Sequence, residues 1–389
     1  MTSPASTPST EPLHPRVLLW GSYDTSKPRI RLLREGMQCA GLGLTEVHAP
    51  VWEDVVDKSQ IRGAAAKLRR LWKLLWAYPA LLWGLVRADR PDVLLVAYPG
   101  LLDVMIARIA ATWWRVPLMF DVFISIYDTV VLDRRILRPG AFAARALRSL
   151  EARCLRWADL PFMDTAAHAR YVESLFKLPP GHVGHVWVGA EIVRFPPLPP
   201  KARNATDPLR VLFYGQFIPL HGIATIIEAA HQLRDAPVEW ILIGEGQESN
   251  RIDAMLRRNP LPKVQRIDWV PYETLIAQLA QADVCLGIFG TSEKAANVIP
   301  NKVFQIIAAG CAFITRDSSA IRELVSEPGA DAVLVPAGDA SALADAVRAR
   351  LLQVPGEVAG RTAQRVVGPD IVGQQFRALV DSALQRQLA

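Results

Sequence analysis

Short apolar runs alternate with longer amphipathic segments along almost the whole chain. In the first half the runs are RVLLWGS, LTEVHAP, DVLLVAYPG, PLMFDVF and LPFMDT, and the segments between them repeat their apolar residues with a helical period. Runs of this length predict strands, and strands that alternate with helices are typical of a parallel sheet covered by helices. The first half therefore predicts an α/β domain.

The same alternation starts again after VGAEIVRFPPLPPKARNATDP, a proline-rich segment without periodicity. The second series of runs is LRVLFYG, VEWILIGEG, VQRIDWV, DVCLGIF, CAFITR and AVLVP. Two such units joined by a linker predict two doubly wound Rossmann-like domains that face a central cleft. Ligands bind in such folds at the carboxyl ends of the strands.

The pattern also divides the chain into segments. The first residues, 1–15, are rich in Ser, Thr and Pro and lack the basic start and apolar core of a signal peptide, so we expect a disordered leader there. We expect an N-terminal domain at 16–190, an interdomain linker at 191–208, a C-terminal domain at 209–368 and a C-terminal helix at 369–389.

Composition and charge narrow the class of protein. The chain has 389 residues, of which 51% are hydrophobic, and this excludes disorder for most of its length. Its net charge of +6 fits a phosphate-bearing ligand, nucleic acid or an anionic membrane surface. Basic and aromatic residues do not interleave on any predicted strand, which disfavours nucleic acid. The four cysteines lack CxxC spacing, so we interpret them as reduced core residues of a cytosolic protein without a zinc site.

The stretch EKAANVIPNKVFQIIAAG, between two predicted strands, carries the clearest chemical signal. Pro300 suits the first turn of a helix, because its missing N–H would have no partner there. A helix that begins between Ile299 and Asn301 would point its N-terminus into the cleft, flanked by Lys294 and Lys302. Free backbone amides, the helix dipole and two ammonium groups favour a diphosphate. The alternative is a solvated basic loop.

Two glycine turns precede this stretch in the C-terminal half. FYGQFIPLHG places Gly215 at a strand tip and Gly222 at a helix start, and IGEGQE places Gly244 after the next strand. Glycines let the backbone approach an anion closely, so each turn is either a phosphate site or an ordinary strand-to-helix turn. Neither contains the full GxGxxG, and a dinucleotide fingerprint is therefore not supported.

These motifs together resemble the retaining glycosyltransferases of family 4, bacterial glycosyltransferase group 1, which have the GT-B fold. The resemblance is densest over 211–336, where YGQFIPLHGI, IGEGQE, DWVPYETL, ADVCLGIFG, VIPNKVFQIIAAG and IRELV follow in the order of that family. In the N-terminal half, AYPGLLDV, DVFISIYDTVVLDR and MDTAAHARYV resemble one bacterial branch of it more loosely.

The resemblance implies a donor site for a nucleotide-diphosphate sugar in the C-terminal domain. Four positions depart from the common pattern: Gln216 and His221 replace an arginine and a lysine, and Asn297 and Gln305 replace a pair of glutamates. A glutamine can still bind sugar or ribose hydroxyls, as a neutral group, and Lys294 and Lys302 would replace the lost positive charge. With the turns above, the expected donor-binding residues are Gly215, Gln216, His221, Gly244, Glu245, Val270, Lys294, Asn297, Ile299, Pro300 and Asn301, with Lys302 and Gln305 in catalytic roles.

The chemistry that the resemblance implies needs few ionisable residues. In a front-face transfer the leaving diphosphate serves as the base for the incoming hydroxyl, and the protein positions both substrates. The chain contains no Asp-x-Asp, so we expect no metal and no other cofactor.

The acceptor side is expected in the N-terminal domain. The residues expected to line it are Gly21, Arg29, Asp121, Tyr127, Asp128 and His168, the last two with catalytic roles. Arg29 is a candidate second-sphere contact of a phosphate or of the acceptor. For Asp121 a buried hydrogen-bonded carboxylate is an equal alternative, and for His168 the alternative is a structural histidine.

One further segment, AKLRRLWKLLWAYPALLWGLVR, predicts a helix that lies in a membrane interface. Its apolar stripe consists of Leu68, Leu71, Trp72, Leu75, Pro79, Leu82, Trp83 and Val86, with Lys67, Arg70 and Lys73 away from it. The alternative is a helix that packs this stripe on its own sheet. No stretch reaches the roughly 18 apolar residues of a membrane-spanning helix.

We therefore expect a retaining hexosyltransferase that moves a sugar from a nucleotide-diphosphate sugar to a lipid-linked or glycan acceptor in bacterial surface polysaccharide assembly. It would be cytoplasmic and peripheral, bound through 67–86 to the anionic cytoplasmic face of the inner membrane, and would not bind nucleic acid. The alternatives are a catalytically silent sugar-nucleotide-binding subunit and a sugar-nucleotide 2-epimerase of the same fold. An epimerase would need carboxylates in the cleft for proton abstraction, and the stretch at 293–310 offers only Glu293.

Overall fold

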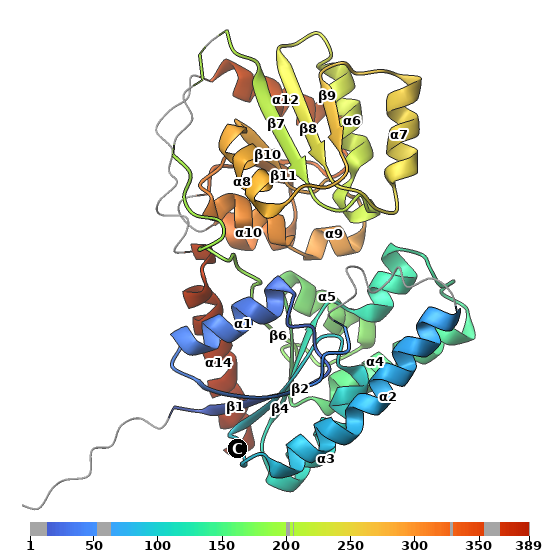
Figure 1. Cartoon of the computed structure of the whole chain (residues 1–389), viewed down its shortest axis with the longest axis vertical. Helices are drawn as coiled ribbons and strands as arrows, with labels where there is room; N and C mark the ends of the chain where they lie inside the picture. The colour runs from blue at the N-terminus through green and yellow to red at the C-terminus, as the bar shows by residue number, and fades with distance from the viewer. Residues whose placement is uncertain are drawn as a thin grey trace, which may run out of the picture.

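The computed structural model describes residues 14–52, 64–199, 203–204, 206–326, 330–353 and 366–388. The expected leader at 1–15 thus lies almost wholly outside the described residues, as do parts of the expected linker. Two six-stranded sheets, one in each half of the chain, stand one above the other in Figure 1. The strand pairs that were expected to be parallel are all parallel.

The N-terminal sheet has the strand order β2-β1-β3-β4-β5-β6. Its strands are β1 (Arg16–Gly21), β2 (Gly43–His48), β3 (Val93–Ala97), β4 (Leu118–Phe123), β5 (Leu160–Met163) and β6 (Gly184–His185). The predicted strands are all present, and β6 is the one that the pattern missed. It is only two residues long and exists because its backbone pairs with Phe162 and Met163 of β5.

The C-terminal sheet has the order β12-β11-β10-β7-β8-β9. Its strands are β7 (Leu209–Tyr214), β8 (Val238–Ile243), β9 (Val264–Ile267), β10 (Val284–Leu286), β11 (Phe313–Arg316) and β12 (Ala332–Val335). All of them were predicted. The order reverses beside the first strand of each sheet, and such a switch point opens a crevice at the carboxyl ends of the strands.

Alternate residues of β1 sort the helices of the N-terminal domain onto two faces. Leu18 and Trp20 pack in one core with residues of α2 (Ala64–Arg87), α3 (Leu101–Trp114) and α4 (Phe142–Trp157). Val17 and Leu19 pack in the other with α1 (Pro28–Cys39) and α14 (Pro369–Leu388). The helix α5 (Ala166–Phe176) follows β5 and lies against the C-terminal domain (Figure 1).

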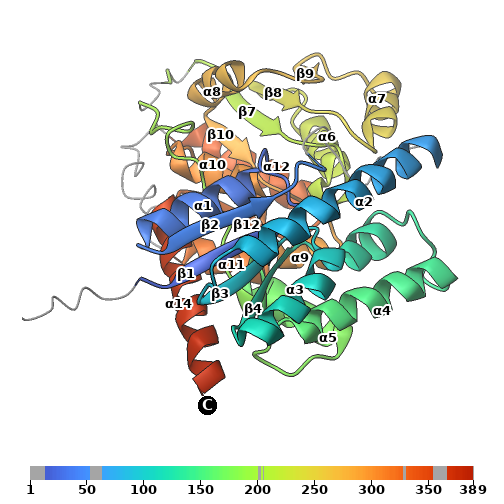
Figure 2. The same cartoon turned by 60° about the horizontal axis from the view of Figure 1, so that its bottom comes forward.

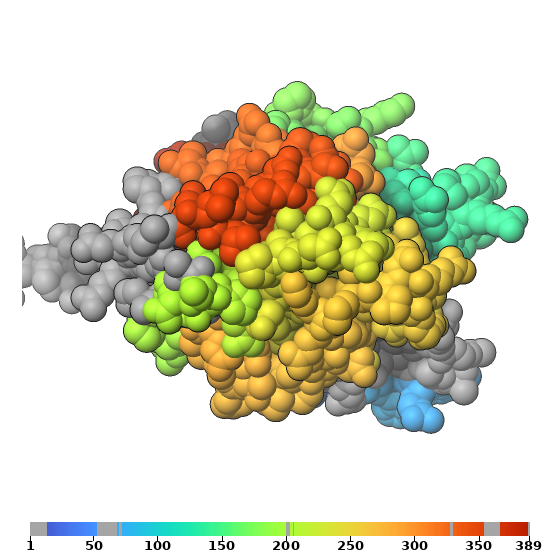
Figure 3. Space-filling model, turned by 90° about the horizontal axis from the view of Figure 1, so that it is seen from above, coloured from blue at the N-terminus to red at the C-terminus, as the bar shows by residue number. Residues whose placement is uncertain are grey.

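The C-terminal domain is also layered. One face of its sheet packs on α6 (Ile223–Gln232), α7 (Ser249–Arg258) and α12 (Ala340–Leu352), and Figure 3 shows α6 (yellow) beside α12 (orange-red) on the outer surface. The opposite face packs on α8 (Tyr272–Gln281), α10 (Asn301–Ala308) and α11 (Ser319–Val325). A short helix, α9 (Glu293–Asn297), occupies part of the stretch that we expected to be a loop.

The outer stripe of α2 does not pack on the sheet. Among the side chains of this helix that the structure describes, the buried hydrophobic ones are Leu74, Leu81 and Leu85, whereas those of the predicted stripe are exposed. The alternative of a stripe packed on its own sheet is therefore wrong. The side chains of Lys67, Arg70 and Leu71 lie outside those that the structure describes. In the described part of the chain, no helix is both long and apolar enough to cross a bilayer.

The cysteine interpretation needs one correction. Cys154 and Cys285 are buried and Cys311 is half-buried, but Cys39 is exposed at the end of α1. Its apolar neighbours Met37 and Leu42 are buried, but Cys39 lies at the helix end beside the exposed Gln38.

The last helix returns to the first domain. α14 packs along α1, and its residues Val372, Phe376, Val380 and Ala383 are buried in the core beneath the N-terminal sheet. The Phe376 ring lies 5.8 Å from the ring of Phe162 in β5. The chain therefore crosses between the domains twice, once at the linker and once before α14.

We predict that Phe376→Ala destabilises the N-terminal domain by about 3–5 kcal/mol, because it leaves a cavity in a core that no other segment can fill. Hydrogen exchange of the β1 and β3 amides under native conditions measures this loss. Gln385→Ala, on the exposed side of the same helix, is the matched control and should change the exchange little. Equal protection in both variants would show that α14 is dispensable for this core.

Candidate functional site

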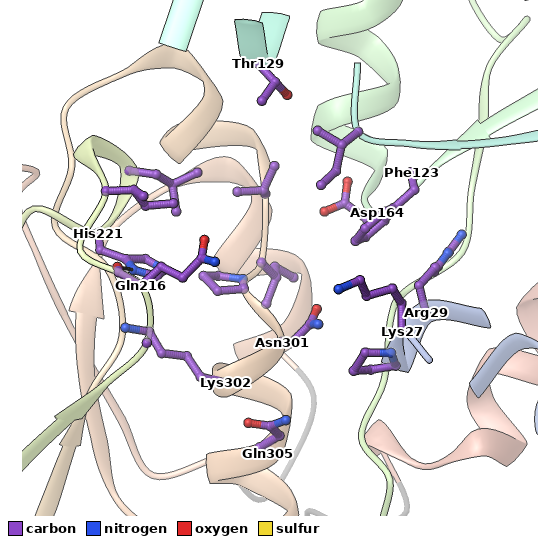
Figure 4. Close-up of a pocket in the computed structure, with 18 of the residues that line it drawn as sticks. Lys27, Arg29, Phe123, Thr129, Asp164, Gln216, His221, Asn301, Lys302 and Gln305 are labelled. Carbon is purple, nitrogen blue, oxygen red and sulfur yellow. Dashed lines mark hydrogen bonds between the residues drawn. The ribbon is translucent and has the colours of Figure 1, made fainter. Parts of the chain in front are cut away.

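A cavity of about 630 Å³ lies between the carboxyl ends of the two sheets and is lined by both domains. In Figure 4 the C-terminal side chains His221, Asn301, Lys302 and Gln305 face Lys27, Arg29 and Asp164 of the N-terminal domain. Ten of the predicted site residues line it: Arg29, Gly215, Gln216, His221, Lys294, Ile299, Pro300, Asn301, Lys302 and Gln305. This size suits an organic ligand of several rings or sugar units.

The start of α10 forms one wall of the cavity. The helix begins at Asn301, within the predicted range, but Pro300 is the residue before its first turn and has extended backbone angles (φ −65°, ψ 146°). No side chain caps this helix, so its first backbone N–H groups remain available to a ligand. The helix itself is almost wholly buried, as its apolar composition predicted. Its N-terminus therefore offers an anion a fixed set of donors.

Lys302 is the unusual group of this wall. Its side chain is buried, and its Nζ has no hydrogen-bond partner and lies 3.6 Å from the centroid of the Phe213 ring. Burial lowers the pKa of Lys302 well below its ordinary value, because an ammonium group without a counter-ion is poorly stabilised away from water. The aromatic ring compensates for only part of that loss. An anion bound in the cavity would supply the missing partner.

The turn after β7 borders the same position. Gly215 and Gln216 line the cavity, and Gly244 lies behind them, where a side chain would come 1.8 Å from the Gly215 carbonyl oxygen. The His221 ring bonds through Nδ1 to the Gln216 carbonyl. Burial, and then the nearby Lys302 charge, lower the pKa of His221 well below its usual value. A neutral His221 adds no charge, so Lys302 is the main cation of this wall.

Gln305 lies one turn further along α10. Its Oε1 accepts a hydrogen bond from the Tyr214 hydroxyl at 3.2 Å, and the residue is buried yet lines the cavity. The carbonyl end of the amide is thus fixed by the protein, which leaves the amide N–H groups to meet a ligand. Asn297, the partner position in the family pattern, does not line the cavity, and its amide donates to the Glu293 carbonyl at 2.8 Å.

Lys294 has a different neighbourhood from the one we expected. Its Nζ donates to the Thr129 hydroxyl and lies 3.9 Å from Asp128 Oδ2, both in the N-terminal domain. Asp128 also accepts a hydrogen bond from Tyr171 and does not line the cavity. Lys294 thus joins the two domains by a buried ion pair as well as lining the cavity, because the π-helical turn at Asp128–Asp133 folds against α9. Its contribution to the charge of the donor site stays a prediction.

A second contact joins the domains nearby. The Glu323 carboxylate of α11 accepts from the backbone N–H groups of Ala166 and Ala167 at 3.0 and 2.7 Å, at the N-terminus of α5. The Thr165 hydroxyl, which caps α5, donates to the Asn297 carbonyl. These contacts hold the two walls of the cavity together.

Arg29 lines the cavity, but its guanidinium forms hydrogen bonds within the N-terminal domain. Nε and Nη2 donate to the Asp121 carboxylate at 3.0 and 2.8 Å, and Nη1 donates to the Val186 and Trp187 carbonyls. Both charged side chains are buried. The expected second-sphere role of Arg29 stays a prediction, and the alternative of a buried hydrogen-bonded carboxylate holds for Asp121.

The remaining predicted residues lie outside the cavity lining. Gly21 abuts Asp103, and Tyr127 is buried in the core against Phe176. His168 is fully buried, with its Nδ1 2.6 Å from Asp164 Oδ1. It reaches the cavity only through Asp164, which does line it. Glu245 and Val270, expected at the donor, are also absent from the lining.

The sequence reasoning missed several lining residues on the N-terminal wall: Lys27, Phe123, Thr129, Asp133, Arg134 and Asp164. Phe123 and Asp164 lie in quoted strand segments, and Thr129, Asp133 and Arg134 lie in the quoted family motif DVFISIYDTVVLDR. The signal was present in the rule that parallel strands end at one edge, but a choice among neighbouring side chains needs the backbone path. In the described residues no group of three or more His, Cys, Asp and Glu side chains is placed to hold a metal ion.

Comparison with known proteins agrees with this geometry. Residues 29–189 match the family model of the glycosyl transferase 4-like domain, and residues 208–353 match that of glycosyl transferases group 1. The chain is 30% identical over 169 residues to a putative colanic acid biosynthesis glycosyl transferase, WcaI, from Escherichia coli K12. This match spans 43% of the chain and 41% of the length of that relative.

Solved structures are similar over almost the whole chain. Sucrose-phosphate synthase from Thermosynechococcus elongatus superimposes with a TM-score of 0.67 at 16% identity, covering 96% of this chain and all of that one. Anabaena HepE in complex with UDP gives a TM-score of 0.60 at 14% identity, over 95% of this chain and 100% of that one. At such identities they support the fold alone, and the expected two-domain GT-B fold is confirmed. The two family models match both domains that line this cavity, and the chain therefore belongs to the group 1 glycosyltransferases.

Proposed function

We propose that the protein transfers a sugar, with retention, from a nucleotide-diphosphate sugar to a lipid-linked or glycan acceptor. The observation that carries the proposal is the buried Lys302 ammonium, which has no hydrogen-bond partner and stands at the uncapped N-terminus of α10 in the interdomain cavity. Two sources of positive potential thus converge where the protein supplies no anion. A diphosphate satisfies both.

The donor is placed with its diphosphate at Lys302 and Asn301, and with sugar or ribose hydroxyls at the Gln305 amide. All three line the cavity on the C-terminal side (Figure 4). The structurally similar HepE has been captured with UDP and with UDP-glucose, which makes UDP-sugars the first donors to test. Gln216 and neutral His221 add hydrogen-bonding capacity beside the phosphates without adding charge.

The transfer proceeds on one face of the donor sugar. The bond from the anomeric carbon to the diphosphate oxygen breaks, the bond to the acceptor oxygen forms, and the acceptor hydroxyl gives its proton to the departing phosphate. Lys302 and the α10 amides stabilise the negative charge that develops on that phosphate. The opposite wall, with Lys27, Thr129 and Asp164, holds the acceptor. This scheme uses no metal and no protein nucleophile.

The biological process that we propose is taken from the name of the E. coli relative WcaI. The E. coli protein is named for colanic acid biosynthesis, so surface polysaccharide assembly is the process we propose. A second candidate function is a catalytically silent sugar-nucleotide-binding subunit. It is favoured by Asn297, which replaces a glutamate of the family and donates its side-chain amide to the Glu293 carbonyl.

The decisive experiment is a two-stage assay. Thermal shift across UDP-, GDP- and ADP-sugars identifies the donor, because a ligand of the native state raises the melting temperature. Release of the nucleoside diphosphate is then measured with and without a bacterial lipid-linked glycan extract. Donor binding without hydrolysis or transfer would support the silent subunit, and no stabilisation by any nucleotide sugar would reject the donor site.

We predict that Lys302→Met weakens binding of the cognate donor by about 1.5–3 kcal/mol, the range for one charge-assisted contact. Calorimetry of donor binding measures the change. Lys263→Met, an exposed lysine far from the cavity, is the control and should bind as the parent does. A Lys302→Met variant that folds normally and binds the donor equally well would show that the diphosphate lies elsewhere.

The same contact has a pH signature. The lowered pKa of Lys302 means that the free protein loses this charge at a lower pH than an exposed lysine does. The diphosphate of a nucleotide sugar does not titrate in the alkaline range, so donor affinity should fall as the pH rises through that pKa. Lys302→Met should remove this pH dependence.

Gln305 should be a working substitute for the glutamate of the family. Gln305→Glu keeps an acceptor for the Tyr214 hydroxyl and should change turnover only modestly, whereas Gln305→Leu should abolish it. The leucine would leave Tyr214 and the donor hydroxyls unpaired, at about 1–3 kcal/mol for each group. Turnover of the cognate donor is the measurement, with Gln278→Leu on α8 as the control. A leucine variant as active as the parent would place Gln305 outside the donor site.

We also propose that α2 brings the enzyme to an anionic membrane as a peripheral protein on the cytoplasmic face. Its stripe of exposed leucines and tryptophans is flanked by the exposed basic residues Arg69, Lys73 and Arg87. Arg87 lies over the Trp83 ring, 4.2 Å from its centroid. Such a face matches the boundary between acyl chains and anionic headgroups.

Binding of the parent to anionic vesicles should decrease with added salt, and Arg69→Glu with Lys73→Glu should reduce it further, by about 1 kcal/mol for each charge removed. Co-sedimentation with phosphatidylglycerol vesicles is the measurement. Arg257→Glu with Arg258→Glu, on α7 of the other domain, changes the net charge equally and is the control. Equal binding of the parent to neutral and anionic vesicles counts against an electrostatic contribution.

A further inference from the structure

In the helices α2, α3 and α4 the acidic residues are buried in the protein. Within their bounds the acidic residues are Asp103 and Glu151, which are 1% and 0% exposed. Asp103 accepts hydrogen bonds from Ser22 and Tyr78, and Glu151 accepts from the backbone N–H groups of Ile126 and Tyr127. The exposed charges of the three helices are therefore all basic, and include Arg69, Lys73, Arg87, Arg145 and Arg153.

The same outer surface exposes large apolar side chains on every one of these helices. They are Trp72, Trp76 and Trp83 on α2, Ile109 and Trp113 on α3, and Phe142 at the start of α4. Ile109, Trp113 and Phe142 are 73%, 78% and 80% exposed. Single exposed apolar residues are ordinary, but a group of this size on neighbouring helices indicates an interaction surface.

The three helices form one rigid layer. Their inner residues share a single core with the strands β1, β3 and β4. Tyr78 of α2 donates to Asp103 of α3 at 2.8 Å, and Cys154 of α4 donates to the Leu101 carbonyl of α3 at 3.2 Å. Figure 2 shows the layer across one side of the N-terminal domain, turned away from α1 and α14. A partner would thus meet all three helices together.

Charge is distributed unevenly between the two halves of the chain. Residues 1–190 contain 24 Lys and Arg against 17 Asp and Glu, whereas residues 191–389 contain 20 against 21. The positive excess of the protein lies entirely in the half that carries the layer. An anionic partner is therefore attracted to the N-terminal domain and not to the donor-binding one.

We propose that the outer face of α2, α3 and α4 is one docking platform for an anionic lipid bilayer. The inference rests on the proposed function and extends the membrane contact from one helix to a three-helix face. Exposed tryptophans beside arginines and lysines, with no exposed carboxylate within the three helices, match headgroups above an acyl layer. One carboxylate at their edge, Asp159, is paired with Arg108 of α3. A protein partner would need a large acidic and apolar surface, whereas any anionic bilayer supplies both properties at once.

The platform fixes how the cavity stands relative to the bilayer. Asp103 accepts from both the backbone and the hydroxyl of Ser22, in the turn that continues to the cavity residue Lys27. The layer is thus joined through this turn to the N-terminal wall of the cavity, which we propose to hold the acceptor. An acceptor with a lipid anchor reaches the cavity without leaving the membrane.

The test measures the contribution of α3 to vesicle binding separately from that of α2. Full-length protein is sedimented with vesicles of phosphatidylcholine alone or of phosphatidylcholine with phosphatidylglycerol. Ile109→Ser with Trp113→Ser should weaken binding to the anionic vesicles by roughly tenfold, since two apolar side chains lose their contact with lipid. Trp269→Ser, a 72% exposed tryptophan on the C-terminal domain, is the matched control and should bind as the parent does.

Thermal shift with the cognate donor, on the same samples, reports folding and the donor site independently of lipid. The platform is overturned if the α3 variant binds vesicles like the parent, or if Trp269→Ser loses as much. It is also overturned if the parent is a dimer in solution that the α3 variant dissociates, because the face then joins two copies. A parent that binds donor but no vesicle rejects the platform and the α2 contact, and leaves the glycosyltransferase proposal standing.

Discussion

The buried pair of Arg29 and Asp121 determines where the chain leaves its first domain. The guanidinium joins α1 to the end of β4 and also holds the Val186 and Trp187 carbonyls, directly before the linker. Loss of either partner would leave an uncompensated buried charge, which costs several kcal/mol. The path of the chain towards the linker therefore depends on this charged contact.

A second set of contacts keeps the walls together while leaving one charge unsatisfied. Lys294 bonds across the interface to Thr129 and lies near Asp128, and Glu323 holds the N-terminus of α5. Lys302, eight residues after Lys294 in the same stretch, has only the Phe213 ring. Two lysines that look equivalent in the sequence therefore differ in their surroundings: Lys294 is paired across the domain interface, whereas the Lys302 ammonium has no hydrogen-bond partner.

On the outer surface of α2, α3 and α4, burial again determines which charges remain exposed. Asp103 and Glu151 are placed inside, where backbone and hydroxyl donors satisfy them, so no carboxylate remains on the surface of α2, α3 and α4. Exposed tryptophans there cost little in a protein that rests on lipid, whereas in free solution they would favour aggregation. Asp103 of α3 also accepts from Ser22, in the turn that leads to the cavity residue Lys27, so the proposed docking face and the cavity are joined through this turn.

The sequence by itself determined the two parallel sheets, the start of α10 and the motifs of the family, because strand length, helix period and a proline are local properties of the chain. The sequence also indicated Lys302, Gln305 and the Gly215 turn as site residues, and all three line the cavity. Only the tertiary structure decided that Arg29 and Lys294 serve the protein, that the stripe of α2 faces outward, and that α14 completes the first domain. Each of these depends on partners 90 or more residues away along the chain or on what does not cover a surface, and periodicity carries no information about either.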